Sequence, residues 1–527
     1  MHRKRWRWFV ALLLTTVITE AAPSTLRFCA QGSPKSFDTA NTDSGVDHIA
    51  TQPIFDGLVE TERGGGKLIP ALASAWTVSA DGRSVSFKLR RGVKFHRTAW
   101  FNPTRDFNAD DVIFTFGRWL DPQSPFQRAF PTLSPYIVAL GWEKLIRKVV
   151  KVDAYEVRVE LASIDASFLT LLGYAFAGMQ SAEYGEQLLK QGKPANIVQW
   201  PIGTGPFAFK SFQPDSLLRY TRNPDYFRRD TPLVDNLVYA ITPDRTVRTQ
   251  RLKRNECDIA VLSNPLDVLA LGNSKTADAQ ITLVSVPGLN TGFLAFNTKK
   301  PPLDKLEVRQ ALDMAIDKKA ILSTVYGASG ELAVSLIPTA MWAHDETLRA
   351  VPHSPDKARD LLKQAGVTSL DLSLWAMPVQ RAYNPNAQLV AQMIQADWAR
   401  VGVKARIVTY EWGEYLKRID LGDHDTALVG WSGTPEPADM AGQLACGAAS
   451  GTFWCDKAYD ELLAQAKQIL DPAQRKLLYA RAQRIAMAAL PWSVLAHGRI
   501  TVALRKNVQG FKLGLDGGLR FDGVTVK

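Results

Sequence analysis

The residues best suited to chemistry lie in one stretch, residues 426–447, which reads TALVGWSGTPEPADMAGQLACG. An apolar run predicts a buried strand, which leads into a turn with two prolines and two carboxylates, Glu436 and Asp439, and then a cysteine. Such carboxylates could anchor a ligand, act in catalysis, or lie in a turn that only connects two elements.

Catalytic motifs are not convincing anywhere in the chain. GWSGT resembles the G-x-S-x-G turn around a nucleophilic serine, here Ser432, but Thr434 stands where that motif has its second glycine. The six histidines beyond residue 21 are dispersed and form neither H-E-x-x-H nor a His/Cys ligand cluster. RGGGK lacks the spacing of a phosphate-binding loop and is typical of a hairpin tip. We therefore predict no enzyme activity, no metal and no cofactor.

The first 21 residues have the pattern of a secretory signal peptide. MHRKRWRW forms a basic region, residues 9–18 form a short apolar region, and Thr19 and Ala21 suit a cleavage site after Ala21. The apolar run is about half a membrane span. Cys29 follows TLRF rather than a small-residue lipobox, so lipid attachment is not expected. We expect an exported, soluble, periplasmic protein.

Length and charge limit the architecture and the partners. With 527 residues, 46% of them hydrophobic and 22% charged, the chain is too long for one core and suggests two domains, or two lobes with a subdomain. The formal charge of +11 falls to +8 without the first 21 residues, and the basic residues are scattered. Nucleic-acid binding is therefore not expected.

Four cysteines lie beyond the predicted cleavage site: Cys29, Cys257, Cys446 and Cys455. An even number in an exported protein favours two disulfides over metal binding. Cys446 and Cys455 would close a short loop, which leaves Cys29 to pair with Cys257. The absence of a C-x-x-C spacing argues against redox catalysis.

Periodicity predicts the elements that position these residues. Residues 71–96 and 148–161 alternate as hairpins, the first around Asp81 and Gly82, and Asn108 is placed to cap a helix. In the second half, residues 370–410 read as strand, helix, strand, which implies parallel pairing and an α/β lobe.

Many ordered stretches resemble the dipeptide-binding members of the peptide and nickel family of extracellular solute-binding proteins, which serve ABC importers. The resemblance covers essentially the whole mature chain and is carried by stretches that include CAQGSP, PTRDFNADDVIFTF, PIGTGPF, LDKLEVRQALDMAIDK, WAMPVQRAYNPNA and SGTFWC. FHRTAWFNPTRDFNADDV is also similar to Sap-type relatives. The four cysteines fall where the family has its two disulfides.

The resemblance implies an α/β Venus-flytrap fold of the type II-like periplasmic binding proteins, with an extra subdomain in the first lobe. The implied division is a signal peptide over residues 1–21, lobe I over 22–56, 197–283 and 503–527, the extra subdomain over 57–196 and lobe II over 284–502. We expect a monomer that closes on a peptide and docks on an inner-membrane permease.

The resemblance also implies ligand-binding residues. In the family an Arg of the MPVQR motif holds the ligand carboxylate. The motif places this arginine at Arg381, and Tyr383 also matches the family pattern. A guanidinium can bind a carboxylate with two hydrogen bonds. The strand end with Trp431, Ser432 and Gly433 is implied to pair with an extended ligand.

Thr434 departs from the family pattern, because it stands where an Asp holds the ligand ammonium. A threonine cannot neutralise a buried ammonium, and an unpaired buried charge costs about 3–5 kcal/mol. Glu436, between two prolines, is the first substitute and Asp439 the second. Alternatively the turn is only structural, or the ligand differs, being an antimicrobial peptide, haem or a metal chelate. An exported hydrolase would need a nucleophile–base pair that the sequence does not supply.

Overall fold

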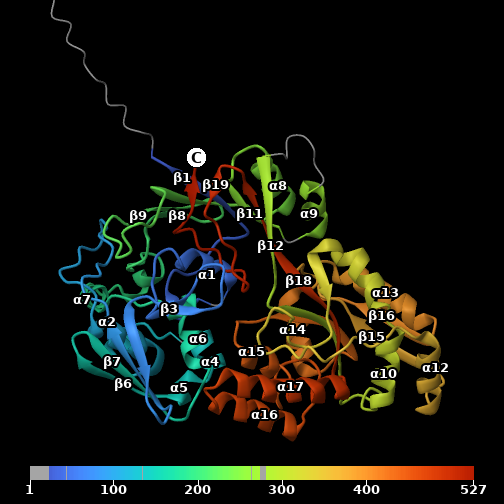
Figure 1. The fold of residues 1–527 in the computed structure, drawn as a ribbon. Helices are drawn as coiled ribbons and strands as arrows, with labels where there is room; N and C mark the ends of the chain where they lie inside the picture. Colours follow the sequence, from blue (N-terminus) through green and yellow to red (C-terminus); the bar gives the residue numbers. More distant parts are fainter. Residues whose placement is uncertain (1–22, 43, 133, 263, 273–279) are drawn as a thin grey trace, which may run out of the picture.

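The computed structural model describes residues 23–42, 44–132, 134–262, 264–272 and 280–527. The predicted signal peptide lies outside these residues. Within them, no helix is both long and apolar enough to cross a bilayer. Figure 1 shows two lobes of helices and strands, one coloured blue to green and the other mainly yellow to orange, with the red strand β18 running between them.

One path of hydrogen-bonded strands passes through both lobes, in the order β16-β15-β17-β13-β18-β11-β1-β10-β9-β8. The first half of β18 (Trp492–Arg505) pairs antiparallel with β13 (Asn290–Phe296), and its second half pairs with β11 (Ile259–Leu262) and β12 (Ile281–Pro287). Val284 of β12 and Val502 of β18, the predicted crossing points, lie opposite each other in this ladder. The domain boundaries themselves stay predictions.

The sheet of the first lobe is mixed. β1 lies parallel between β10 and β11, and β9 and β8 continue from β10 in antiparallel pairing. Their bounds are β1 (Thr25–Ala30), β8 (Phe207–Gln213), β9 (Leu217–Arg222) and β10 (Asn236–Ile241). β8 was not predicted from the sequence; its Phe207 and Phe209 are buried at a spacing of two, as expected for a strand. The disulfide between Cys29 and Cys257 has the expected pairing.

A separate four-stranded antiparallel sheet, β4-β5-β7-β6, confirms both predicted hairpins. Its strands are β4 (Ala73–Val78), β5 (Ser84–Leu89), β6 (Ile146–Asp153) and β7 (Glu156–Leu161). The alternate residues Val85, Phe87 and Leu89 are buried. The glycine run forms the tip of a small hairpin of β2 (Val59–Thr61) and β3 (Leu68–Pro70), as predicted.

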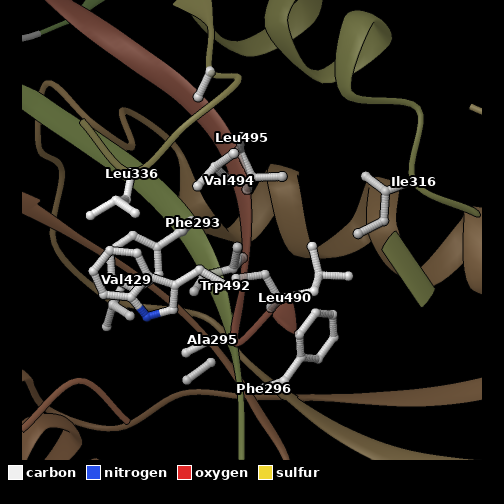
Figure 2. Close-up of a cluster of buried hydrophobic side chains, with 14 of the residues drawn as sticks. Phe293, Ala295, Phe296, Ile316, Leu336, Val429, Leu490, Trp492, Val494 and Leu495 are labelled. Atoms are coloured by element: carbon white, nitrogen blue, oxygen red, sulfur yellow. The ribbon is translucent and has the colours of Figure 1, made fainter. Parts of the chain in front are cut away.

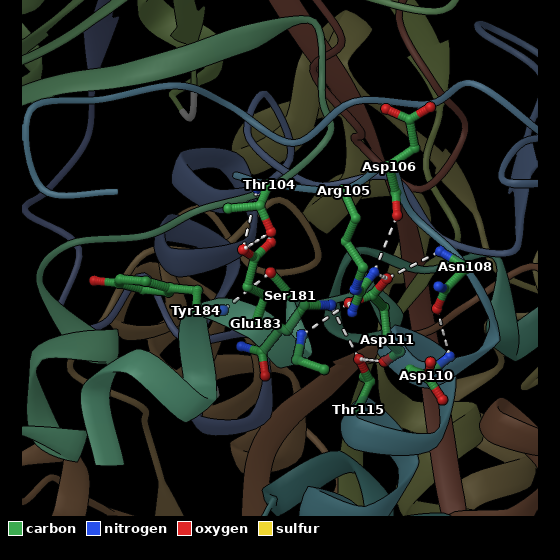
Figure 3. Close-up of polar contacts among 12 residues, drawn as sticks. Thr104, Arg105, Asp106, Asn108, Asp110, Asp111, Thr115, Ser181, Glu183 and Tyr184 are labelled. Carbon is green, nitrogen blue, oxygen red and sulfur yellow. Dashed lines mark hydrogen bonds and ion pairs between the residues drawn. The ribbon is translucent and has the colours of Figure 1, made fainter. Parts of the chain in front are cut away.

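Helix α2 (Ala109–Leu120) packs on this sheet and begins with the predicted cap (Figure 3). The Asn108 side chain accepts the Asp110 N–H at 2.8 Å, while the Asp111 carboxylate accepts the Asn108 N–H at 2.9 Å. Asp111 also accepts two hydrogen bonds from Arg105, at 2.7 and 2.8 Å, and one from the Ala182 N–H at 2.8 Å. Asp111 therefore also ties α2 to α7 (Ala182–Lys190).

The second lobe confirms the predicted strand–helix–strand unit, because β15 (Leu370–Trp375) and β16 (Val403–Val408) pair parallel and α13 (Ala387–Ala399) joins them. β15 also pairs parallel with β17 (Thr426–Ser432), and β17 pairs antiparallel with β13. The larger helices around this sheet are α10 (Leu306–Ala315), α12 (Pro355–Gln364), α14 (Trp412–Leu421), α16 (Lys457–Gln468) and α17 (Pro472–Ala489).

The core of this lobe is dense where β13, β17 and β18 meet (Figure 2). The rings of Phe293 and Trp492 stack with centroids 3.7 Å apart. Val429 of β17 and Leu336 lie close to the pair in Figure 2. The buried rings hold β17 and β13 in a fixed register, so the exposed end of β17 has a defined position.

Candidate functional site

The end of β17 has a free edge. β17 pairs with β13 along its whole length, from Thr426 opposite Phe296 to Ser432 opposite Asn290. On its other edge, among the described residues, β15 pairs only with Thr426 and Ala427. Trp431 is 38% exposed and Ser432 is also exposed. The Leu428 carbonyl already accepts the Tyr415 hydroxyl at 2.9 Å, so residues 430–432 are the part of this edge that can accept a further extended chain.

Arg381 lies beside this edge, in the loop after β15. Its backbone N–H and carbonyl exchange hydrogen bonds with Asn384, at 3.1 and 3.0 Å, which fixes a tight loop. The exposed guanidinium donates to the Gln380 carbonyl at 3.0 Å and lies 5.8 Å from the Trp412 ring centre. No carboxylate of the described residues forms an ion pair with it. The positive charge is free to bind an anion.

Tyr383 fixes the position of the Arg381 loop against β17. Its side chain is 7% exposed, and burial raises the pKa of its phenol. A Cβ at Gly430 would lie 2.3 Å from the Tyr383 ring, and one at Gly292 would lie 2.0 Å from the Tyr383 carbonyl. Both glycines are therefore required for this close approach. The same carbonyl accepts a 2.7 Å hydrogen bond from the Tyr326 hydroxyl.

Asp439 lies just beyond the exposed C-terminal end of β17. Its carboxylate accepts the Thr434 N–H at 2.7 Å and the Trp431 indole N–H at 3.2 Å. Burial raises its pKa, and these hydrogen bonds only partly oppose the shift. No Lys, Arg or His among the described residues lies within ion-pair distance of it. This carboxylate is desolvated without a positive partner.

Glu436 has a different environment. Its side chain is 2% exposed and forms an ion pair with Arg475, and it also accepts the Tyr479 hydroxyl at 3.3 Å. Burial raises the pKa of Glu436 and the Arg475 charge opposes that effect. Glu436 also caps a short helix, α15 (Pro437–Gly442), that the sequence reading took for part of the turn. Its role as an amine anchor stays a prediction, but its charge is already neutralised.

The remaining predicted residues line the same region without forming a catalytic set. Gly433 donates its N–H to the Leu289 carbonyl at 2.8 Å, and the Thr434 hydroxyl accepts the Glu436 N–H at 3.3 Å. No hydrogen bond joins Ser432 to a histidine or carboxylate side chain in the part of the chain that the structure describes. Cys446 and Cys455 form the second predicted disulfide.

A cavity of about 460 Å³ opens beyond Pro435 and Glu436. Its lining comes from both lobes and includes Leu289, Trp342, Arg475 and Asp516. None of these four was a candidate in the sequence reading, since nothing in their local pattern separates them from ordinary core and surface residues. Among the described residues there is no group of three or more His, Cys, Asp or Glu side chains that could hold a metal ion.

Comparison with known proteins finds relatives over nearly the whole chain. The family model of bacterial extracellular solute-binding proteins, family 5 Middle, matches residues 67–453. Di/tripeptide-binding protein 1 of Pseudomonas aeruginosa (strain UCBPP-PA14) is 47% identical over 95% of this chain and 94% of the relative. Heme-binding protein A of Haemophilus influenzae is 38% identical over 97% and 94% of the two chains. A dipeptide binding protein from Pseudoalteromonas sp. SM9913, solved with Met-Leu, superposes with a TM-score of 0.83 at 37% identity, over 95% of this chain and 100% of that one.

Proposed function

Because the chain belongs to family 5 of the bacterial extracellular solute-binding proteins, we propose a role in peptide transport. In this proposal it captures dipeptides or short oligopeptides between its lobes and delivers them to an ABC transporter permease. Relatives named as peptide-binding proteins support this ligand class. We include in the proposal export by the predicted signal peptide, a periplasmic location and a monomeric state.

One observation carries the proposal: Arg381 and Asp439, opposite charges without an ion-pair partner among the described residues, lie on two segments that contact the exposed end of β17. The Arg381 loop contacts Gly430 through Tyr383, while Asp439 accepts hydrogen bonds from Trp431 and Thr434.

The proposed binding mode assigns one task to each part of the site. Arg381 binds the peptide carboxylate, Asp439 binds the ammonium, and the backbone of residues 430–432 pairs with the peptide main chain. Both charged ends lose water on enclosure, so each needs an opposite charge. Closure of the lobes then removes the peptide from solvent and produces the form that docks on the permease.

Calorimetry with a panel of dipeptides and their C-terminal amides tests the proposal. Arg381→Ala should weaken binding of free-acid dipeptides about tenfold to a hundredfold, since a hydrogen bond to a charged group contributes about 1.5–3 kcal/mol. The amides should bind wild type and variant alike. Arg359→Ala, at an exposed arginine of the same lobe, is the matched control. An equal loss for acids and amides would contradict the assignment.

A haem ligand is the second candidate, because Thr434 replaces the family's amine-binding Asp and one relative is named a haem-binding protein. Native mass spectrometry of freshly purified protein, with absorption spectra after haemin addition, distinguishes the two. Bound haem together with no binding across the peptide panel would replace the peptide proposal.

A further inference from the structure

The regular pairing of β18 with β12 and β13 is interrupted at residues 497–498. Arg499 pairs with β12, whereas Ala496 pairs with β13. On the opposing segment, residues 288–291 lie across from this interval and form an irregular bulge. At this point β18 therefore passes from the ladder of the second lobe to that of the first.

The side chain of Asn290 bridges the interruption. Its amide nitrogen donates to the Gly498 carbonyl at 2.9 Å, and its amide oxygen accepts the Gly498 N–H at 2.8 Å. Asn290 is 2% exposed, so water does not compete for these hydrogen bonds. An asparagine amide offers a donor and an acceptor side by side, as a peptide group does. Asn290 thereby replaces the ladder hydrogen bonds that the bulge removes.

Gly498 also supports the loop that carries Arg381. A Cβ at residue 498 would lie 2.0 Å from the Ala382 carbonyl oxygen, so the two backbones are in direct contact and only glycine fits. Within the loop, Arg381 and Asn384 are joined by their backbone hydrogen bonds. A shift of Gly498 would therefore move the Arg381 backbone, and the guanidinium with it.

The segment around Asn290 also holds the exposed end of β17. Asn290 lies opposite Ser432 in the ladder of β13 and β17, and the Leu289 carbonyl accepts the Gly433 N–H at 2.8 Å. In the proposed binding mode this end of β17 pairs with the peptide main chain, whereas Arg381 binds the peptide carboxylate. Residues 289–290 thus contact one of these binding groups directly and the other through Gly498.

We infer that Asn290 is a positioning residue for peptide binding, because its amide, acting through Gly498, fixes the Arg381 loop relative to the end of β17. The inference rests on the proposed function. Both polar atoms of the Asn290 side chain are bonded to Gly498, so the residue acts without contact with the peptide. Removal of the amide lets β18 shift at the bulge, and the Ala382 carbonyl and the Arg381 guanidinium move with it.

Calorimetry with dialanine and its C-terminal amide tests this role. In Asn290→Ala the affinity for dialanine relative to the amide should fall about tenfold, because the misplaced guanidinium loses a hydrogen bond to a charged group. The double variant Asn290→Ala with Arg381→Ala should have the same acid-to-amide ratio as Arg381→Ala alone, since the position of the loop no longer matters once the guanidinium is gone. A merely structural residue would lower stability without changing this ratio.

Asn297→Ala is the matched control. Asn297 directly follows β13 and is also 2% exposed, and its amide donates to the Gly422 and His424 carbonyls at 3.1 and 3.0 Å. This variant removes a buried amide at the other end of the same strand and should leave the acid-to-amide ratio unchanged. Retained binding of the amide shows that each variant is folded.

Gly498→Ala is a second variant, which keeps the Asn290 amide. Its methyl group would force the Ala382 carbonyl away from β18 and should lower the ratio in the same way, so it decides the question if Asn290→Ala does not fold. An unchanged ratio in either folded variant, or a further fall of the ratio in the double variant, would overturn the positioning role while the peptide receptor stands. If wild type binds no member of the dipeptide panel, the proposed function fails and the positioning role with it.

Discussion

The carboxylates of Glu436 and Asp439 lie three residues apart but have opposite electrostatic situations. Glu436 is buried against Arg475, so its negative charge stabilises a positive charge of the protein itself. Asp439 accepts only hydrogen bonds from neutral donors. Because removing one partner of a buried ion pair is far more costly than changing an unpaired carboxylate, substitution can separate the two roles.

We predict that Glu436→Gln acts on stability and Asp439→Asn acts on binding. Glu436→Gln leaves the buried Arg475 charge unpaired and should lower the free energy of unfolding by about 3–5 kcal/mol. Asp439→Asn should keep the fold. It should lower the affinity for peptides with a free amine and leave the affinity for N-acetylated peptides unchanged. Urea unfolding and calorimetry measure the two effects. If Glu436→Gln keeps stability and loses amine-dependent binding, Glu436 is the anchor after all.

Asp56, away from the site, should make stability depend on pH. Burial raises its pKa from 3.8 to about 6, although Thr204 and Tyr226 donate hydrogen bonds to it. Between these values the folded state keeps a proton that the unfolded chain releases, so the free energy of unfolding falls as pH rises. The fall should amount to about 3 kcal/mol between about pH 4 and 6. Urea unfolding across this range should show a smaller fall in Asp56→Asn than in wild type and in the control Asp230→Asn, at an exposed aspartate; a residual fall is expected because the pKa values of Glu436 and Asp439 are also raised.

Sequence reasoning proposed site residues that belong to recognisable motifs and did not single out residues whose place depends on distant contacts. Arg381 and Tyr383 lie in a run that resembles a family motif. Arg475 pairs with Glu436 from 39 positions away, and its place near the start of a long helix resembles that of an exposed arginine. Asp516 becomes relevant only because the C-terminal segment packs against the second lobe.

Among the elements, those with strong periodicity or turn signals were predicted well. The hairpins β4–β5 and β6–β7 and the β15–α13–β16 unit occur as expected. The short helix α15 was missed because six residues are too few to show a helical period. The Glu436-Pro437 pair was the available signal, since a capping side chain followed by proline is typical of a helix start.

The two disulfides should contribute unequally to the stability of the elements that they join. Cys446–Cys455 spans 9 positions, whereas Cys29–Cys257 spans 228 and joins β1 to the start of β11. From the entropy of loop closure in the unfolded chain, loss of Cys446–Cys455 should lower the free energy of unfolding by about 3 kcal/mol, and loss of Cys29–Cys257 should lower it by about 5 kcal/mol. Serine pairs at each bridge, compared by urea unfolding, measure the difference. A larger loss at the short loop would show that its disulfide does more than restrict the unfolded chain.

Over the whole molecule, the lobes already touch on the side away from β18. The Ala166 N–H donates to the Lys467 carbonyl at 2.8 Å, and the Lys467 ammonium lies 3.8 Å from Asp165. These contacts join the region of residues 165–166 to α16. They amount to one backbone hydrogen bond and one long ion pair with a half-exposed lysine, which is a small contribution to holding the lobes together.

We therefore predict that peptide shifts the protein towards the closed form. Small-angle X-ray scattering should give a smaller radius of gyration with saturating peptide than without it. The melting temperature should rise, since ligand at about 100 times its Kd adds about 2.7 kcal/mol to the native state. Arg381→Ala at the same peptide concentration is the control and should show a weaker response. An unchanged radius at saturation would contradict closure on the peptide.

The long strand β18 has a consequence for how the chain acquires its structure. It follows every other strand of the large sheet in sequence, yet it lies in the middle and pairs with β13 on one side of the molecule and with β11 and β12 on the other. Until residues 492–505 are synthesised, β13 and β11 each lack a neighbour, and neither lobe can complete its sheet. Completion of both sheets is therefore delayed to the end of synthesis, which agrees with the proposed export of an unfolded chain through a membrane.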